Sequence, residues 1–196
     1  LLEGCSFPGL LRSPVKSGVT LCLIHIWILN LSSKIAQKLV KTKSLCNFSI
    51  KYEEQQKLHD IAAQVSAKRI GSDIQTLVDF GTRHTLSETK SDTRGIGAAR
   101  RWIKKEFEKI SSQCGGCLEV IEVKDTISGE KRIPNPVEVV NIVAIQRGST
   151  EPNRMVIMSG DIDSRVSDVM DFTSDSPGAN DNASGVAGVI EAARVL

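Results

Sequence analysis

The feature that most constrains the fold of this sequence is a near-continuous run of β-branched and aliphatic residues, EVVNIVAIQRG, at positions 138–148. A short run of this composition is typical of a strand that is buried on both faces of a sheet. The apolar stretch from Arg154 to Met158 follows shortly afterwards and predicts a second buried strand over 154–160. Two such strands require other elements to cover both faces of their sheet.

Helical periodicity around these runs supplies the covering layers. Residues 93–112 repeat apolar side chains on one face and basic side chains on the other, which predicts an amphipathic helix. Its inward-facing residues are Ile96, Ala99, Ile103, Phe107 and Ile110. Further helices are predicted over 53–70, over 71–84 with a stop at Gly81, and over 184–196, and a strand is predicted over 118–127. The sequence therefore predicts an α/β layered domain.

Three aspartates lie where ligands bind in such sheets, beyond the carboxyl ends of strands. Asp161 and Asp163 follow the predicted strand on one side of its end, and Asp181 precedes the last predicted helix. Neighbouring carboxylates suit a divalent metal. The spacing alone leaves a structural explanation open, in which Asp163 binds backbone amides, Asp181 caps the helix and Asp161 is exposed.

The charge is unevenly distributed although the net charge is only +2. Residues 1–50 contain six Lys and Arg against one acid, and residues 151–196 contain three Arg against eight acids. No basic stripe is interleaved with aromatic residues, which argues against a nucleic-acid partner. The acidic end is where a metal or a cationic group would be attracted.

Residues 1–50 are expected to be an N-terminal extension that makes few contacts with the domain over 51–196. Their most apolar part, GVTLCLIHIWILNL at 18–31, is too short for a stable membrane span. With Arg12 and Lys16 ahead of it, it fits the hydrophobic region of a secretory signal, which would imply a secreted or periplasmic protein. Upstream sequence outside any folded domain is the alternative. A first residue other than Met and an abruptly ending last helix suggest a fragment at both ends.

Cys114 and Cys117 are the only close pair among five cysteines. A structural zinc site needs a second pair, and a redox motif would lie at a helix N-terminus rather than after a helix. The Cys-Gly-Gly-Cys stretch therefore predicts a helix-to-strand turn that carries a small disulfide if the protein is exported.

Residues 54–196 resemble the first half of the zinc-dependent exopeptidases of the aminopeptidase S and Y type. These metallopeptidases of clan MH are related to glutamate carboxypeptidases and glutaminyl cyclases. LVDFGTRHT at 77–85 and TRGIGAARRWIKKEF at 93–107 resemble their N-terminal helices. VIMSGDIDSR at 156–165 resembles their strand ending in Gly-His-x-Asp-Ser, and the residues from 176 to 196 resemble their Pro-Gly-Ala-x-Asp-Asn-x-Ser-Gly loop and helix. The resemblance implies a three-layer zinc-exopeptidase-like fold with a mixed central sheet flanked by helices, truncated after that last helix.

The resemblance also implies roles for individual residues. Asp181 would bridge two zinc ions, Asp163 would orient a ligand, and Ser164, Gly178 and Gly185 would shape the backbone around them. The peptide bond Asp181–Asn182 would be cis, as is common after the bridging aspartate. The activity implied is metal-assisted hydrolysis of a peptide at its free N-terminus, or of a related amide.

Two departures from the family pattern bear on activity. Asp161 stands where the family has a histidine; zinc accepts both ligands, but an aspartate reaches about one ångström less far from its Cβ. We expect Asp161 to remain a ligand, with a changed metal preference as one consequence. The family's other ligands and its base, which are two glutamates, an aspartate and a histidine, lie downstream of the last helix. We expect His25, His59 and His84 to be surface or packing residues.

The chain as it stands is therefore expected not to hydrolyse peptides. Two other functions remain open from the sequence. One is a non-catalytic, receptor-like binding module with the same fold, in which Asp161 marks the loss of the metal site. The other is a structural calcium site in the acidic region 161–181.

Overall fold

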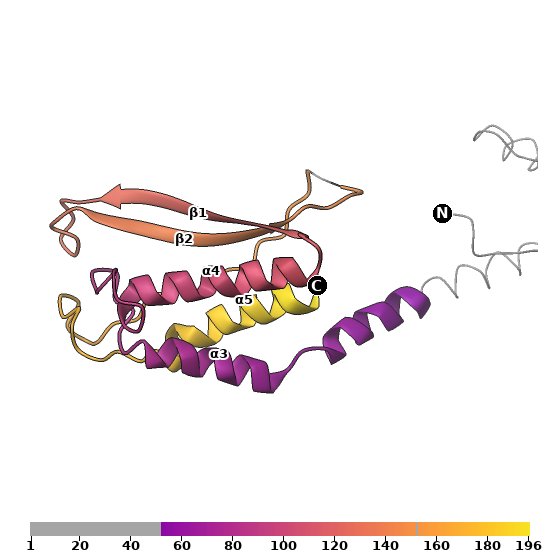
Figure 1. Ribbon diagram of the computed structural model, residues 1–196, viewed down its shortest axis with the longest axis horizontal. Coiled ribbons are helices and arrows are strands. Elements are labelled where there is room, and N and C mark those ends of the chain that lie inside the picture. The colour runs from indigo at the N-terminus through magenta and orange to yellow at the C-terminus, as the bar shows by residue number, and fades with distance from the viewer. Residues whose placement is uncertain (1–51, 152) are drawn as a thin grey trace, which may run out of the picture. The chain divides into compact units, whose positions relative to one another are not determined.

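The computed structural model describes residues 52–151 and 153–196, so the predictions made for residues 1–50 lie outside its range. One helix covers 52–63, and the other elements all belong to the compact unit Ile61–Leu196. Their order is α3 (Ala67–Asp79), α4 (Gly95–Gln113), β1 (Leu118–Ile127), β2 (Val137–Gln146), η1 (Ala179–Ala183) and α5 (Ser184–Val195) (Figure 1). None of the helices in the described ranges has the length and apolarity that crossing a membrane requires.

β1 and β2 form a long antiparallel hairpin that is covered on one face by α4 (Figure 1). The strands pair from Leu118 opposite Gln146 to Ile127 opposite Val137. Side chains alternate between the two faces of a strand, so Leu118 and Val120 of β1 and Ile142 and Ala144 of β2 share one face, and all four belong to the apolar core that α4 joins. The strand predicted over 118–127 is confirmed residue for residue.

α4 is the central element of the apolar core, and its predicted inward face is confirmed. Its five predicted core residues are all buried: Ile96, Ala99, Ile103, Phe107 and Ile110. α5 packs against both α4 and α3 through Val186 and Ile190, and Leu77 of α3 joins the same cluster. The three helices and the hairpin therefore share one core.

The helices predicted over 53–70 and 71–84 have a different boundary in the structure. The first ends at residue 63, and α3 begins only after Ser66, whose hydroxyl accepts a hydrogen bond from the Arg69 N–H at 3.3 Å. This cap starts the helix because it satisfies an N–H group that has no partner within the helix. The predicted stop at Gly81 is confirmed: α3 ends at Asp79, and Gly81 has a φ of +70°.

The turn after α4 carries a disulfide between Cys114 and Cys117. The two glycines between them have φ values of +72° and +89°, a region that side chains rarely adopt. The predicted helix-to-strand turn with a small disulfide is therefore confirmed.

Two predictions about strands are wrong in the described residues. β2 is not buried on both faces, since Glu138 and Asn141 are exposed along it. The segment 154–160 forms no strand, and Met155, Val156 and Ile157 are 77–89% exposed. The sheet is thus a two-stranded antiparallel pair rather than a mixed central sheet between two helix layers. An apolar segment becomes a strand only where a neighbouring strand supplies hydrogen-bond partners, and in the described ranges none lies beside 154–160.

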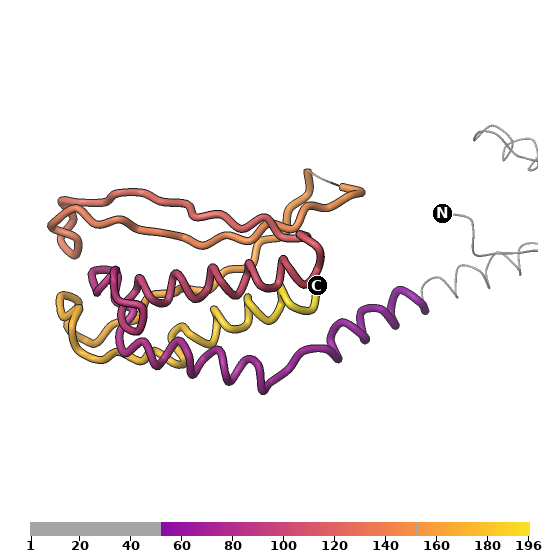
Figure 2. The backbone as a smooth tube through the Cα atoms, in the orientation of Figure 1, coloured from indigo at the N-terminus to yellow at the C-terminus, as the bar shows by residue number. Residues whose placement is uncertain are grey.

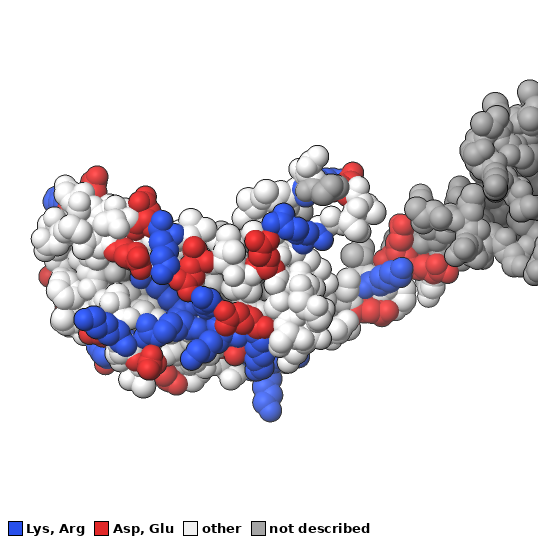
Figure 3. Space-filling view, turned by 45° about the horizontal axis from the view of Figure 1, so that its top comes forward, with Lys and Arg blue, Asp and Glu red and all other residues white. Residues whose placement is uncertain are grey.

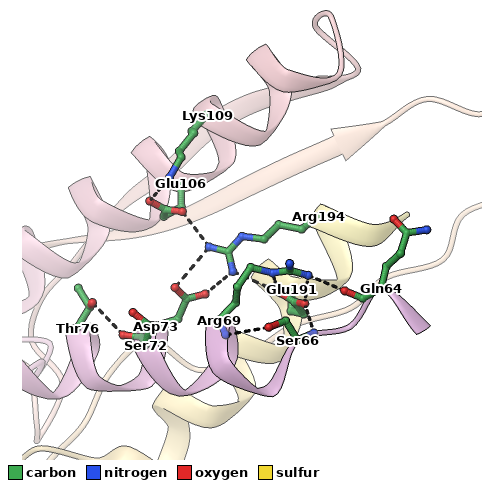
Figure 4. A network of polar contacts seen from close by, with 10 residues as sticks. All are labelled: Gln64, Ser66, Arg69, Ser72, Asp73, Thr76, Glu106, Lys109, Glu191 and Arg194. Carbon is green, nitrogen blue, oxygen red and sulfur yellow. Dashed lines mark hydrogen bonds and ion pairs between the residues drawn. The ribbon is translucent and has the colours of Figure 1, made fainter. Parts of the chain in front are cut away.

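An ion-pair network joins the first half of α3, the second half of α4 and the end of α5 (Figure 4). Arg194 of α5 pairs with Asp73 of α3 at 2.5 Å and with Glu106 of α4 at 2.8 Å. Glu191, 2% exposed, accepts hydrogen bonds from the Ser66 N–H and from Arg69. The network fixes how α5 lies against the two other helices.

Lys and Arg side chains form a band across the face drawn in Figure 3, with Asp and Glu side chains beside them. On the outer surface Lys104 and Lys124 both lie 2.9 Å from Glu122, and Arg101 lies 3.1 Å from Asp92. The hydrogen bond from Lys124, and after it the one from Lys104, lower the pKa of Glu122 to about 2. The pairs therefore neutralise several of the surface cations within the chain itself.

Candidate metal centre

The two aspartate-bearing segments meet at a buried arginine, Arg83, in the connection between α3 and α4. Arg83 is 0% exposed, and its guanidinium donates only to backbone carbonyl oxygens. Nε donates to Ile162 O at 2.9 Å, Nη1 to Leu77 O at 2.7 Å and to Pro177 O at 2.8 Å, and Nη2 to Gly178 O at 3.0 Å. Arginine suits this position because its planar fork presents five donors in fixed directions.

Ser164 forms a second connection between the same segments. Its buried hydroxyl accepts from the Arg83 N–H at 3.0 Å and donates to Ser176 O at 2.6 Å. The Ser164 N–H donates to Arg83 O at 3.3 Å, and the Ser176 N–H donates to Gly81 O at 2.8 Å. The loop 165–175 is therefore held at both ends against the residues that follow α3 (Figure 2).

Asp161 and Asp163 follow an extended segment that passes directly over the start of α5. A Cβ at Gly160 would lie 2.6 Å from the Val186 nitrogen and 2.7 Å from the Gly185 carbonyl carbon, which leaves no space for a side chain. This close approach places Asp161 beside the N-terminal turn of α5. The first turn of a helix favours negative charge and bound anionic groups.

Asp181 lies in η1, which is an irregular turn rather than a helix at this point. Asp181 has φ −117° and ψ 96°, and its peptide bond to Asn182 is cis, as the resemblance predicts. Gly178 begins the turn at φ +48°, and a Cβ there would lie 2.6 Å from both Asp181 O and Ser164 Cβ. A Cβ at Gly185 would collide with the Asn182 side chain. Ser164 and both glycines thus shape the backbone on which Asp181 stands.

The three carboxylates have the donor chemistry of a divalent-metal site. Asp161, Asp163 and Asp181 are exposed, and the described structure gives none of them a hydrogen bond or ion pair. Carboxylate oxygens bind zinc as well as harder cations, so these residues fit a metal ion. Across the described ranges, no group of three or more His, Cys, Asp and Glu side chains is placed to hold a metal by itself. The carboxylates are thus suitable donors in kind, but the three are not gathered closely enough to hold a metal by themselves.

Of the three aspartates, Asp163 is the one whose charge acts on the pKa of Arg83. Burial lowers the pKa of the Arg83 guanidinium, and the negative charge of Asp163 opposes this effect. A buried cation is costly unless it is hydrogen-bonded and its charge is balanced nearby. Asp163 therefore balances a charge that lies beneath the site.

His84 is a packing residue, as predicted. Its Nδ1 accepts from the Leu86 N–H at 3.0 Å, so its Nε2 carries the proton and donates to Val169 O at 3.2 Å. Both ring nitrogens are occupied, and the ring lies 6.3 Å from the ring of Phe172. The residue anchors the 165–175 loop and has no free nitrogen for a metal.

Arg83 is the residue of this site that the sequence did not single out. It lies between Gly81-Thr82 and His84, directly after the stop of α3. A charged residue in a short turn normally suggests an exposed side chain. The only available signal was its place within the family-like stretch LVDFGTRHT at 77–85.

Comparison with known proteins shows which family this chain resembles. Residues 141–196 match the family model "Peptidase family M28". Proteins named "Probable zinc metalloprotease" from Leptosphaeria maculans and Pyrenophora teres f. teres are 47% and 49% identical over 142 and 140 residues, which is 72% and 71% of this chain. A protein of the same name from Pyricularia oryzae is 47% identical over 134 residues, or 68% of this chain. No solved structure is significantly similar.

The chain spans about a third of the length of these curated relatives, with 33%, 29% and 26% of each covered. The family match covers α5, η1 and the segment that bears Asp161 and Asp163. The chain is therefore a relative of the M28 peptidases, and the curated proteins that it matches are named zinc metalloproteases.

Proposed function

We propose that this chain contributes the N-terminal part of the metal site of a zinc-dependent peptidase. The observation that carries the proposal is the meeting of two segments, 160–164 and 177–181, around Arg83, Ser164 and the first turn of α5. Both segments present exposed carboxylates with no hydrogen-bond partner. The zinc metalloproteases that the chain resembles support the same conclusion.

Each aspartate would have its own role in this proposal. Asp181 and Asp161 would hold the zinc, with Asp161 in place of the family histidine, and Asp163 would orient a ligand while its charge balances that of Arg83. When bound, such ions polarise the scissile carbonyl and make water a nucleophile near neutral pH. The chain's own contribution is to hold Asp161 and Asp181 at one end of α5. In this proposal the remaining ligands and the general base come from residues other than Asp161, Asp163 and Asp181, as the family pattern places them downstream of α5.

The substrate that we propose is a peptide with a free N-terminus, as for an aminopeptidase-type exopeptidase. Support comes from the stretches 156–165 and 176–196, which resemble exopeptidase motifs. In the same proposal residues 51–196 form part of a three-layer α/β domain.

We also propose that the protein is exported, with 18–31 as the hydrophobic region of a signal. The disulfide between Cys114 and Cys117 supports this, because disulfides persist in oxidising compartments. Fusing residues 1–50 to a reporter and assaying its secretion tests the proposal. Retention of the reporter inside the cell would contradict it.

The test of the proposed activity uses a protein in which this chain is continued to the length of its relatives. We expect hydrolysis of amino-acid anilides that a chelator abolishes, that added zinc restores, and that Asp181→Ala removes. Glu130→Ala, which removes an exposed carboxylate from the hairpin turn, is the matched control and should retain activity. Zinc content equal to wild type in Asp181→Ala would contradict the assignment of Asp181, and loss of metal in Asp161→Ala would support Asp161 as a ligand.

A further inference from the structure

We infer that Arg83 is a positioning residue for the metal site, because it fixes the segment of Asp161 and Asp163 relative to the segment of Asp181. The inference rests on the proposed function for its link to metal. In the described structure the Arg83 side chain donates to backbone carbonyl oxygens and to no carboxylate. Its effect would pass through the backbone alone.

The hydrogen bonds of Arg83 reach both aspartate-bearing segments. One donor goes to Ile162 O, in the residue between Asp161 and Asp163. Two donors go to Pro177 O and Gly178 O, which lie four and three residues before Asp181. A single rigid guanidinium therefore sets the separation of the two segments, and it does so by three of its donors.

Among the residues that the structure describes, no other side chain donates hydrogen bonds to both segments. Ser164 ties its own segment to Ser176, two residues before Gly178, through one hydroxyl. The fourth Arg83 bond, to Leu77 O at 2.7 Å, anchors the guanidinium to the end of α3. Arg83 therefore connects the two segments to a rigid helix as well as to each other. Metal ligands need such support to keep a precise geometry.

Keeping a cation at this buried position costs free energy. Arg83 is fully buried, and burial lowers its pKa. Carbonyl oxygens and the nearby charge of Asp163 offset that cost, so the position selects an arginine that can reach all four acceptors. A lysine has three donors on one nitrogen and cannot span acceptors that Arg83 contacts through Nε, Nη1 and Nη2.

The experiment compares Arg83→Lys with Arg100→Lys in the full 196-residue chain. Arg100 is the matched control, because it is also buried, its pKa is also lowered by burial, and it donates to one carbonyl, Glu138 O at 3.2 Å. It lies on α4 against β2 and contacts neither aspartate segment. Hydrogen exchange is measured without metal, and Co²⁺ binding is followed by its visible absorption spectrum.

We expect Arg83→Lys to speed exchange of the Ser164, Ser176 and Ala183 amides by about tenfold while α4 stays protected. We expect its Co²⁺ affinity to fall about tenfold or more, with an altered absorption spectrum. Arg100→Lys should leave these three amides and the Co²⁺ spectrum unchanged. If Arg83 had a purely structural role, Arg83→Lys and Arg100→Lys would both lower stability, and the two variants would not differ in the exchange of these amides or in the Co²⁺ spectrum. Ser164→Ala, which removes the other connection, should give a smaller effect of the same kind.

Three outcomes bear on the inference. Unchanged exchange at Ser164, Ser176 and Ala183 in Arg83→Lys would overturn it, whatever the metal does. Faster exchange with wild-type Co²⁺ affinity would overturn the link between Arg83 and the metal. A wild-type chain that binds no Co²⁺ would contradict the proposed metal site in this chain, while the exchange data would still decide whether Arg83 holds the two segments.

Discussion

At Gly178 the backbone turns with a φ of +48°, in the region that residues with a side chain rarely adopt. A Cβ at this position would also press against Asp181 O and Ser164 Cβ at 2.6 Å. We therefore predict that Gly178→Ala lowers the free energy of unfolding by about 2 kcal/mol, because it adds steric strain to a turn that the surrounding contacts fix. Urea denaturation followed by circular dichroism measures the difference.

The control for this change is Gly188, which lies within α5, where an added Cβ meets no atom within 4 Å. Gly188→Ala should raise the free energy of unfolding by about 0.5–1 kcal/mol, because alanine loses less backbone entropy in a helix. Equal effects of the two substitutions would show that the turn before Asp181 is not fixed as described.

At the scale of the elements, the ion-pair network of Figure 4 determines how α5 lies on α3 and α4. Glu191 is its most buried carboxylate, and its hydrogen bonds with Arg69 above all lower its pKa from 4.5 to about 2. We predict that Glu191→Gln lowers the free energy of unfolding at pH 7 by about 2 kcal/mol. This lies below the range for fully buried pairs because Arg69 is 46% exposed.

The same network predicts a pH dependence with a definite sign. A carboxyl whose pKa is lower in the folded state stabilises the fold above its unfolded pKa and loses this contribution as the pH falls through its folded pKa. The difference between wild type and Glu191→Gln should therefore be full above about pH 5 and should shrink toward pH 2. Thermal unfolding at pH 7, 4 and 2.5 measures this trend. Glu108→Gln is the control, since its contact with Lys104 is exposed and 4.0 Å long, and it should change stability little at any pH.

At the scale of the whole molecule, the chain of 196 residues is predicted not to turn over peptides. The described residues bring no group of three or more metal-binding side chains together, and a hydrolytic site needs a held metal and a positioned base. Assays of the purified chain with amino-acid anilides and added zinc, manganese or cobalt should give no turnover. Metal-dependent turnover that disappears in Asp181→Ala would contradict this prediction.

The exposed segment 154–160 gives a further expectation at this scale. Met155, Val156 and Ile157 form a run of apolar surface that promotes association between molecules. Val156→Lys should therefore increase the monomeric fraction measured by size-exclusion chromatography. Thr126→Lys, on the exposed part of β1, is the matched control and should change this fraction less.

The sequence by itself determined those features that depend on neighbours along the chain. The apolar face of α4 repeats every three to four residues, β1 has the composition of a strand, and Gly81 ends a helix, so each could be predicted within a short window. The identity and order of Asp161, Asp163 and Asp181 were also readable, and so was the cis bond after Asp181 through the family resemblance. Local patterns carry this information because periodicity and turn chemistry act over a few residues.

Only the tertiary structure decided how distant segments meet. Arg83 is 79 residues from Ile162 and 95 from Gly178, and no pattern in the sequence shows that its side chain is buried against their carbonyl oxygens. The same holds for 154–160, which has the composition of a buried strand but lacks a strand beside it in the described residues. In both cases the outcome depends on hydrogen-bond partners that are remote in sequence, because a buried donor or a strand edge is stable only where such partners are brought to it by the fold.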